Sequence, residues 1–349
     1  MREGVGVTEW DFTKITVLSG GHGGAKFIQG LLHGIAARRL PGVSPDATVT
    51  VVANTADDLW IHGLKVCPDL DTVMYTLGNG LDHERGWGRT DETWSVKDEL
   101  ATYGVEGSWF GLGDRDIATH LVRTQMLEAG YPLSQVTAAL CDRWLSPVHG
   151  DAVRLLPMTD DRVETHVVLA DPGEPSGRRA VHFQEYWVRL RAEPPVEQLV
   201  VVGLGECAPA PGVLESLSDA DLVLVPPSNP IVSVGTILGV PGVREALVST
   251  KAPVVGFSPI IGGHHVRGMA EQLLGAAGIE VSAAGVGLHY GSRASGGILD
   301  HWVVDAGEAP DDVRRLVDAG LGATPTALWM TTPEHTADFL AAALADVTR

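Results

Sequence analysis

The chain has 349 residues, of which 44% are hydrophobic and 20% charged, so it can form one large domain with an insertion, or two domains of ordinary size. Its formal net charge of −19 disfavours nucleic acids and membrane surfaces as partners, because both attract Lys and Arg. The three cysteines, Cys67, Cys141 and Cys207, form no Cys-x-x-Cys pair, which disfavours a disulfide framework and a structural zinc site.

The N-terminal region does not have the features of a signal peptide. It carries Glu3, Glu9 and Asp11 and lacks an apolar core. No apolar run approaches the roughly 18 residues of a membrane-spanning helix. We therefore expect a cytoplasmic protein.

Short apolar runs bounded by Gly, Pro or Asp predict buried strands along the chain. They are Ile15–Leu18, Val49–Ala53, Leu199–Val202, Leu222–Val225, Val254–Phe257 and Leu328–Met330. Segments with helical spacing follow them. This alternation predicts an α/β fold with a doubly wound, mostly parallel, Rossmann-like sheet.

The pattern changes between residues 71 and 195. Helices are predicted at Asp116–Ala129 and Leu133–Trp144, followed by strand-like pieces at Glu164–Leu169 and Arg179–Phe183. We interpret 71–195 as an inserted, mainly helical capping subdomain, 14–70 with 196–349 as the nucleotide-binding core, and 1–13 as an N-terminal extension. The insertion should cover the carboxyl ends of the core strands, where ligands of open α/β sheets bind.

A glycine-rich loop follows the first predicted strand and precedes a predicted helix. Its glycines are Gly20, Gly21, Gly23 and Gly24. Without a Cβ the backbone N–H groups can approach an anion, and a helix N-terminus attracts one, so we predict phosphate binding; a tight turn without a ligand is the alternative. Phe27 stands where a Walker loop needs a hydroxyl, and Lys26 replaces the third glycine of a dinucleotide fingerprint.

Four aspartates follow the second predicted strand: Asp57, Asp58, Asp69 and Asp71. Clustered carboxylates repel one another unless a cation lies among them, and Mg²⁺ typically takes one or two carboxylates together with phosphate oxygens. The cluster therefore predicts a magnesium site, with Asp57 and Asp58 as catalytic candidates. Asp71 could instead cap the helix that follows, and Asp57 and Asp58 could lie in a solvated turn.

Two later strand exits carry further candidates. Ser228, Asn229 and Pro230 follow the strand Leu222–Val225 and predict a rigid polar turn that contacts a nucleotide, or a helix cap alone. Arg267 follows the strand Val254–Phe257 and is a candidate phosphate contact.

Taken together, the ordered motifs resemble the 2-phospho-L-lactate transferases of coenzyme F-420 biosynthesis. The motifs are Gly20–Gly24, Asn54–Asp58, Pro68–Gly78, Gly113–Asp116, Thr119–His120, Pro226–Pro230 and Ser258–Gly262. Two further stretches, Asp91–Trp94 and His182–Arg189, resemble the actinobacterial branch, whose members use phosphoenolpyruvate.

This resemblance implies a transfer from a guanosine diphosphate-linked three-carbon acid to the ribityl hydroxyl of the deazaflavin Fo, with release of GMP. An enolpyruvyl donor would give dehydro-F-420-0 and a lactyl donor F-420-0; the sequence leaves this choice open. The resemblance also implies magnesium as cofactor and a homodimer.

The resemblance implies three sets of contacts. The guanosine nucleotide would contact the four loop glycines, Ser228, Asn229, Pro230 and Arg267; Fo would contact Asp58, Thr93, Trp94 and Lys97; the metal would contact Asp57, Asp58, Asp69 and Asp71. One alternative is a non-catalytic, sugar-nucleotide-binding regulatory protein on the same core, although such relatives lack the 91–94 and 113–116 motifs. The other, a nicotinamide oxidoreductase, is disfavoured by Lys26.

Overall fold

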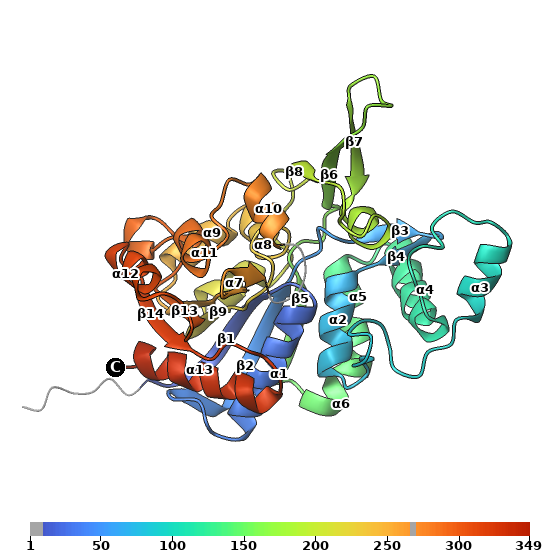
Figure 1. Ribbon diagram of the computed structural model, residues 1–349. Coiled ribbons are helices and arrows are strands. Elements are labelled where there is room, and N and C mark those ends of the chain that lie inside the picture. The colour runs from blue at the N-terminus through green and yellow to red at the C-terminus, as the bar shows by residue number, and fades with distance from the viewer. Residues whose placement is uncertain (1–9, 266–269) are drawn as a thin grey trace, which may run out of the picture.

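The computed structural model describes residues 10–265 and 270–349, and its centre is a seven-stranded sheet (Figure 1). The strand order is β14-β13-β10-β9-β1-β2-β5, and every pairing between neighbours is parallel. The strands are β1 (Phe12–Ser19), β2 (Val43–Ala53), β5 (Val153–Pro157), β9 (Leu222–Val225), β10 (Val254–Phe257), β13 (His301–Asp305) and β14 (Gly322–Thr326). The doubly wound parallel sheet predicted from the sequence is confirmed.

The strand order reverses between β1 and β9. From β1 the chain adds β2 and β5 on one side, and it then returns to add β9, β10, β13 and β14 on the other. In open α/β sheets such a reversal leaves a crevice outside the carboxyl ends of the two central strands, and ligands bind there. The glycine-rich loop follows β1 and the Ser228 turn follows β9, so both lie at this crevice.

Helices cover both faces of the sheet, which explains the continuous apolar strands. In β9, Leu222 and Leu224 belong to one hydrophobic cluster and Val223 and Val225 to the other. The first cluster packs under α1 (His22–Ala36), α2 (Pro68–Leu77), α5 (Leu133–Trp144) and α13 (Pro333–Val347). The second packs under α7 (Val213–Ser218), α8 (Val234–Gly239), α9 (Val243–Ser249), α10 (Ala270–Ala276), α11 (Ala283–Tyr290) and α12 (Pro310–Asp318).

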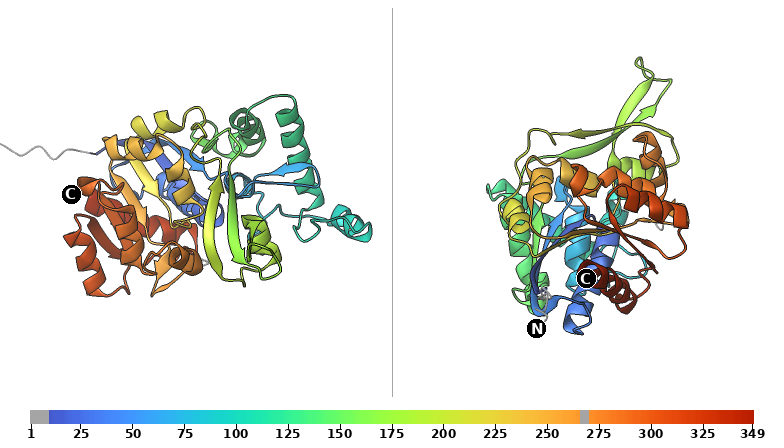
Figure 2. Two further views of the ribbon diagram at one scale, coloured as in Figure 1. Left: turned by 90° about the horizontal axis from the view of Figure 1, so that it is seen from above. Right: turned by 90° about the vertical axis from the view of Figure 1, so that its left-hand side faces the viewer.

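The remaining elements extend from the core, as Figures 1 and 2 show. A hairpin of β3 (Leu59–Ile61) and β4 (Leu64–Val66) packs with the loop before α4 (Asp114–Glu128), and α3 (Ser95–Thr102) lies beyond it. The strands β7 (Arg178–His182), β6 (Glu164–Ala170) and β8 (Val196–Val202) form an antiparallel sheet in that order. A π-helix, η1 (Glu185–Arg189), follows β7 along the chain. Short elements complete the chain: α6 (Ser146–His149), β11 (Ile260–Ile261), β12 (His264–His265) and the 3-10 turn η2 (Arg293–Ser295).

Two predicted core strands are wrong. Leu199–Val202 lies in β8 of the antiparallel sheet. Alternate residues of this segment are exposed, as in a sheet with one face toward solvent, whereas a core strand would be buried on both faces. Leu328–Met330 is not a strand and instead lines a cavity. The edge strand is β14, whose Gly322 and Pro325 weakened the sequence signal; an edge strand tolerates proline because one side needs no partner.

The predicted insertion also contains part of the core sheet. Strand β5 pairs with β2, so the segment 71–195 is not wholly outside the core. The predicted helix Leu133–Trp144 is confirmed as α5, and it packs against β5. The division of the chain into domains otherwise stays a prediction. Within the described residues, no helix has the length and apolar character needed to cross a membrane.

Candidate active site

A cavity of about 870 Å³ lies at the carboxyl edge of the sheet, beside the crevice between β1 and β9. Its volume is within the range of small-molecule sites, about 300–1,000 Å³. Its wall comes from the glycine loop, the segment 57–75, the 86–88 and 110–120 segments, residues around η1, and the loops after β9, β10 and β14. The cavity thus brings together segments of the core and of the predicted insertion.

The glycine loop places the N-terminus of α1 at the cavity. Gly21 and Gly23 line the wall, and neither a side-chain cap nor an acidic residue occupies the first turn of α1. Gly20 and Gly24 lie behind them: a Cβ would lie 2.6 Å from Ser233 Oγ at Gly20 and 1.9 Å from Ser19 Oγ at Gly24. A Cβ would also lie 2.5 Å from Asp69 Oδ1 at Gly21 and 3.1 Å from the Pro227 carbonyl oxygen at Gly23, so all four glycines allow close packing.

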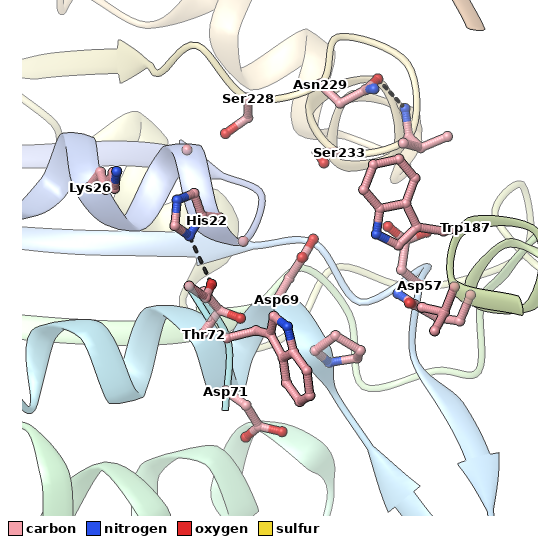
Figure 3. Close-up of a pocket in the computed structure, with 18 of the residues that line it drawn as sticks. His22, Lys26, Asp57, Asp69, Asp71, Thr72, Trp187, Ser228, Asn229 and Ser233 are labelled. Carbon is pink, nitrogen blue, oxygen red and sulfur yellow. Dashed lines mark hydrogen bonds between the residues drawn. The ribbon is translucent and has the colours of Figure 1, made fainter. Parts of the chain in front are cut away.

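The turn after β9 faces this loop. Ser228 and Asn229 line the cavity, and Ser228 Oγ accepts a hydrogen bond of 3.1 Å from the Gly20 amide. Asn229 Oδ1 accepts hydrogen bonds from the amides of Ile231 (2.9 Å) and Val232 (3.1 Å), which fixes the turn; Figure 3 draws one of them. Pro230 is not among the lining residues. Arg267 lies outside the described residues.

Asp57 and Asp69 form a pair bridged by one amide group, that of Asn54. Asn54 Nδ2 donates to Asp57 Oδ2 at 3.2 Å and to Asp69 Oδ2 at 3.0 Å. Asn54 Oδ1 in turn accepts from the Ala56 amide at 2.9 Å and from Thr236 Oγ1 at 2.8 Å. We call Asp57, Asp69 and Asn54 the bridged pair; both acids line the cavity.

The bridged pair resists ionisation. Burial, followed by the charge of Asp69, raises the pKa of Asp57 well above its ordinary value. Burial likewise raises the pKa of Asp69, to about 7. Among the described residues, Oδ1 of Asp57 is buried and makes no hydrogen bond. An additional cation or proton would therefore stabilise these two acids.

The bridged pair fits one kind of metal site. Within the described part of the chain, no group of three or more His, Cys, Asp or Glu side chains is arranged to hold a metal ion. Mg²⁺, however, commonly takes only one or two carboxylates and completes its shell with water and phosphate oxygens. Asp57 and Asp69 beside an uncapped helix N-terminus match that pattern.

Asp58 lies behind the bridged pair, where it is 1% exposed and does not line the cavity. Its Oδ2 is 3.3 Å from Lys65 Nζ. Burial raises the pKa of Asp58, and the charge of Lys65 opposes this effect. Its predicted contacts with metal and Fo stay predictions.

Asp71 belongs to a second group of buried residues, on the insertion side of the cavity. The guanidinium of Arg123 donates to both oxygens of Asp71, and Arg123 Nη1 lies 2.9 Å from His120 Nδ1. His120 Nε2 is 3.3 Å from Asp116 Oδ2, and Tyr75 donates to Asp116 Oδ1 at 2.7 Å. We call Tyr75, Asp71, Asp116, His120 and Arg123 the neutralised network. Since residue Cys67 is the N-cap of α2, Asp71 does not cap that helix.

The three remaining Fo candidates do not line this cavity. Thr93 Oγ1 donates to Asp114 Oδ2 at 2.6 Å. Trp94 packs behind Trp87, with ring centroids 6.0 Å apart, and Lys97 Nζ lies 5.4 Å from the Trp94 ring centroid. Lys97 instead lines a smaller cavity of about 230 Å³. Contact of these three residues with Fo stays a prediction.

Several residues to which no role was assigned from the sequence carried detectable signals. Asn54 directly follows β2 and precedes the acidic cluster, so its position indicated an amide group that can donate hydrogen bonds to the acids. Asp116, His120 and Arg123 are spaced four and three residues apart on α4, which places them on one helix face. Trp87 stands between two glycines, and the contacts that hold it are visible only in three dimensions.

The chain is similar to known proteins over most of its length. The chain matches the family described as 2-phospho-L-lactate transferase CofD over residues 15–324. It is 56% identical over 331 residues to a phosphoenolpyruvate transferase of Streptomyces coelicolor, covering 95% of this chain and 97% of the relative. Phosphoenolpyruvate transferases of Thermobifida fusca (54% over 331 residues; 95% and 97% covered) and Mycobacterium avium (53% over 341 residues; 95% and 98% covered) are also similar.

A solved structure shares the fold. A Bacillus halodurans protein aligns with a TM-score of 0.59 at 16% identity, covering 96% of this chain and 99% of the other. At that identity the likeness concerns architecture alone. The sequence matches extend from β1 to β14, and so include both the glycine loop and the acids of the cavity. The chain therefore belongs to the 2-phospho-L-lactate transferase CofD family.

Proposed function

We propose that this transferase moves a phosphoenolpyruvyl group from a guanosine diphosphate-linked donor to the ribityl hydroxyl of Fo, forming dehydro-F-420-0 and releasing GMP. The observation that carries the proposal is the position of the bridged pair beside the uncapped N-terminus of α1. The enolpyruvyl group, rather than the lactyl group, is favoured by the names of the similar actinobacterial proteins.

The donor diphosphate would bind at the glycine loop. The amides of Gly21 and Gly23 and the positive end of the α1 dipole favour anionic oxygens there. Lys26 lies one turn further along α1 and also lines the cavity, so it adds a positive charge. Ser228 and Asn229 would contact the nucleotide from the adjoining turn after β9.

The acids would then act on the acceptor. A magnesium ion held by Asp57 and Asp69 would neutralise charge on the transferred phosphoryl group. The ribityl oxygen attacks the phosphorus that carries the three-carbon acid, the bond from that phosphorus to the GMP oxygen breaks, and GMP leaves. Asp57 would accept the hydroxyl proton, and the burial that raises the pKa of this carboxyl favours uptake of a proton.

The remaining wall would exclude water from this transfer. Trp187 from η1 lines the cavity, as do Trp329 and Phe110. An apolar wall strengthens electrostatic interactions inside and limits hydrolysis of the donor. The resemblance also supports a homodimer, which light scattering of the purified protein would test.

Competition between the two donors tests the proposed function. Purified protein is incubated with Mg²⁺, Fo and equal amounts of the enolpyruvyl and lactyl guanosine donors, and the products are identified by mass spectrometry. We expect dehydro-F-420-0 and GMP in equal amounts. A dominant lactyl product would reassign the donor, and failure to form either product would overturn the proposed function.

A further inference from the structure

Trp87 is an aromatic wall of the cavity on the insertion side that no step above uses. It lies between Gly86 (φ +73°) and Gly88 (φ +68°), and a Cβ at Gly88 would meet no atom within 4 Å. The glycine at 88 is therefore needed for backbone conformation rather than for space. The Trp87 side chain is 43% exposed although it lines the cavity, so part of its ring is available to a ligand.

The Trp87 ring is held in place without a ligand. Trp94 packs edge-on against it at 6.0 Å between ring centroids, with an interplanar angle of 71°. Arg85 Cζ lies 5.7 Å from the Trp87 ring centroid and 5.1 Å from that of Trp94. An ion pair of 2.7 Å between Arg85 Nη2 and Asp82 Oδ2 holds the guanidinium there. Such preorganisation lowers the ordering cost of binding a flat molecule.

The loop that carries Trp87 is attached to the phosphate loop. His22, the first residue of α1, lies with Nδ1 2.9 Å from the Gly86 carbonyl oxygen (Figure 3). Because a carbonyl oxygen only accepts, Nδ1 carries the proton and donates. The position of the Trp87 ring is thus tied by one hydrogen bond to the glycine loop.

The surroundings of Trp87 suit a planar ring with polar edges. Phe110 and Leu112 add apolar lining, and a Cβ at Gly111 between them would lie 3.2 Å from the Trp87 ring, while Asp116 and His120 add polar groups to the lining. A phosphate or a three-carbon acid would gain little from an indole face, whereas an aromatic ring stacks on it favourably. Ser228 and Asn229, which would contact the nucleotide, line the cavity from the core loop after β9, whereas Trp87 lines it from the predicted insertion.

We propose that Trp87 is the stacking platform for the tricyclic ring of Fo, and that His22 is a positioning residue that holds this platform in register with the phosphate loop. This inference rests on the proposed function, because it assumes Fo as acceptor. It makes Trp87 a determinant of acceptor specificity. The bound ring would place the ribityl chain toward the bridged pair.

Binding of Fo without donor tests the platform. Titration of Fo fluorescence should show affinity about ten-fold or more weaker in Trp87→Ala, and within about three-fold of wild type in Trp87→Phe, since base–aromatic stacking commonly has an effect of this size. Trp60→Ala is the matched control: Trp60 is 47% exposed on β3 and does not line the cavity, so it should bind Fo as wild type does. GDP affinity should be unchanged in all three.

The outcomes separate the two proposals. Wild-type protein that does not bind Fo would refute the proposed function. Wild-type binding with Trp87→Ala within two-fold of it would refute the platform alone, and an equal loss of GDP affinity would show that Trp87 serves the nucleotide instead.

A double-mutant cycle tests His22. His22→Ala should weaken Fo binding about three-fold or more in the wild-type background and have almost no effect in Trp87→Ala, because its effect passes through the ring. His22→Asn, whose amide can donate in place of Nδ1, should recover part of the loss. Additive effects of His22→Ala and Trp87→Ala would refute the positioning role.

Discussion

Two groups of buried acids face the same cavity and differ in what offsets their charge. In the bridged pair, Asp57 and Asp69 share the amide of Asn54, and no Lys, Arg or His forms an ion pair with them among the described residues. In the neutralised network, Arg123 pairs with Asp71, and His120 lies 3.3 Å from Asp116. The first group therefore lacks an internal cation and the second contains one.

The pKa values differ in the same way. Burial raises the pKa of both Asp57 and Asp69. Burial also acts to raise the pKa of Asp116, but the hydrogen bond and charge of His120 lower it below its ordinary value. The comparison teaches that proximity of carboxylates does not identify a reactive site by itself. The acids left without an internal cation are the ones available to a metal ion or a substrate proton.

The largest expected effect is on turnover in Asp57→Asn. Loss of the proton acceptor should lower kcat by about 10²–10⁴-fold. The free energy of unfolding should stay the same or rise, because a repulsive buried charge is removed. Steady-state kinetics and urea denaturation measure the two quantities.

Asp58→Asn provides the comparison for that variant. It should lower stability, because Lys65 loses its buried partner. If Asp57→Asn keeps more than a tenth of wild-type turnover, the bridged pair is not the reactive group.

The neutralised network should respond mainly in stability. Arg123→Met removes the guanidinium that pairs with both oxygens of buried Asp71 and leaves only His120 Nδ1, 3.7 Å away, which should cost about 3–5 kcal/mol in urea denaturation. The double variant Asp71→Leu with Arg123→Met should recover much of this loss, because apolar replacement of a whole buried pair is often tolerated. A loss of stability below about 1 kcal/mol in the single variant would contradict the inference that Arg123 neutralises Asp71.

The sequence predicted most of the central sheet because its strands are buried on both faces. Leu222–Val225 and Val254–Phe257 match β9 and β10 in both bounds, since every residue in them is buried and apolar. Strands β5, β13 and β14 were missed: Arg154 interrupts the apolar pattern of β5, and His301, Asp305 and Pro325 interrupt that of the other two. Pairing with a neighbour stabilises such strands, and no local pattern records it.

The site was predicted as a set of segments and not as contacts. The glycine loop was found because it follows a buried strand directly, and the aspartates because they cluster along the chain after the next one. The partners that distinguish the acids were not: Arg123 is 52 residues from Asp71 along the chain, and Thr236 is 182 residues from Asn54. Sequence spacing therefore indicated where acids gather but not which of them carry an internal cation.

The two groups should also differ in the sign of their pH dependence. The pKa of Asp69 rises from 3.8 to about 7 on folding, so the stability that this group contributes is full below its unfolded pKa and is lost as the pH increases to about 7. Asp116 has a lowered pKa, so its contribution is present above its unfolded pKa and is lost as the pH falls.

Urea denaturation of wild type and Asp69→Asn between pH 4 and 8, without divalent cations, measures this dependence. The wild type should lose a few kcal/mol relative to the variant over the range, and added Mg²⁺ should restore stability at the upper end by binding the folded protein. A wild type that gains stability relative to Asp69→Asn as the pH rises would contradict the raised pKa.

Asn54→Ala should show the smallest effect. This variant tests both the stability and the Mg²⁺ affinity that we assign to the bridged pair. The variant removes two hydrogen bonds to carboxylates and leaves Thr236 without its acceptor on Asn54, which should cost about 1–3 kcal/mol of stability. Because groups that orient metal ligands commonly change metal affinity about 10–100-fold, the Mg²⁺ concentration for half-maximal activity should rise by a similar factor. Thr236→Val, which keeps Asn54 in place but removes its hydroxyl partner, should shift both quantities less. A loss of stability with unchanged Mg²⁺ dependence would mean that Asn54 has a structural role alone. It would contradict the proposal that the bridged pair binds Mg²⁺.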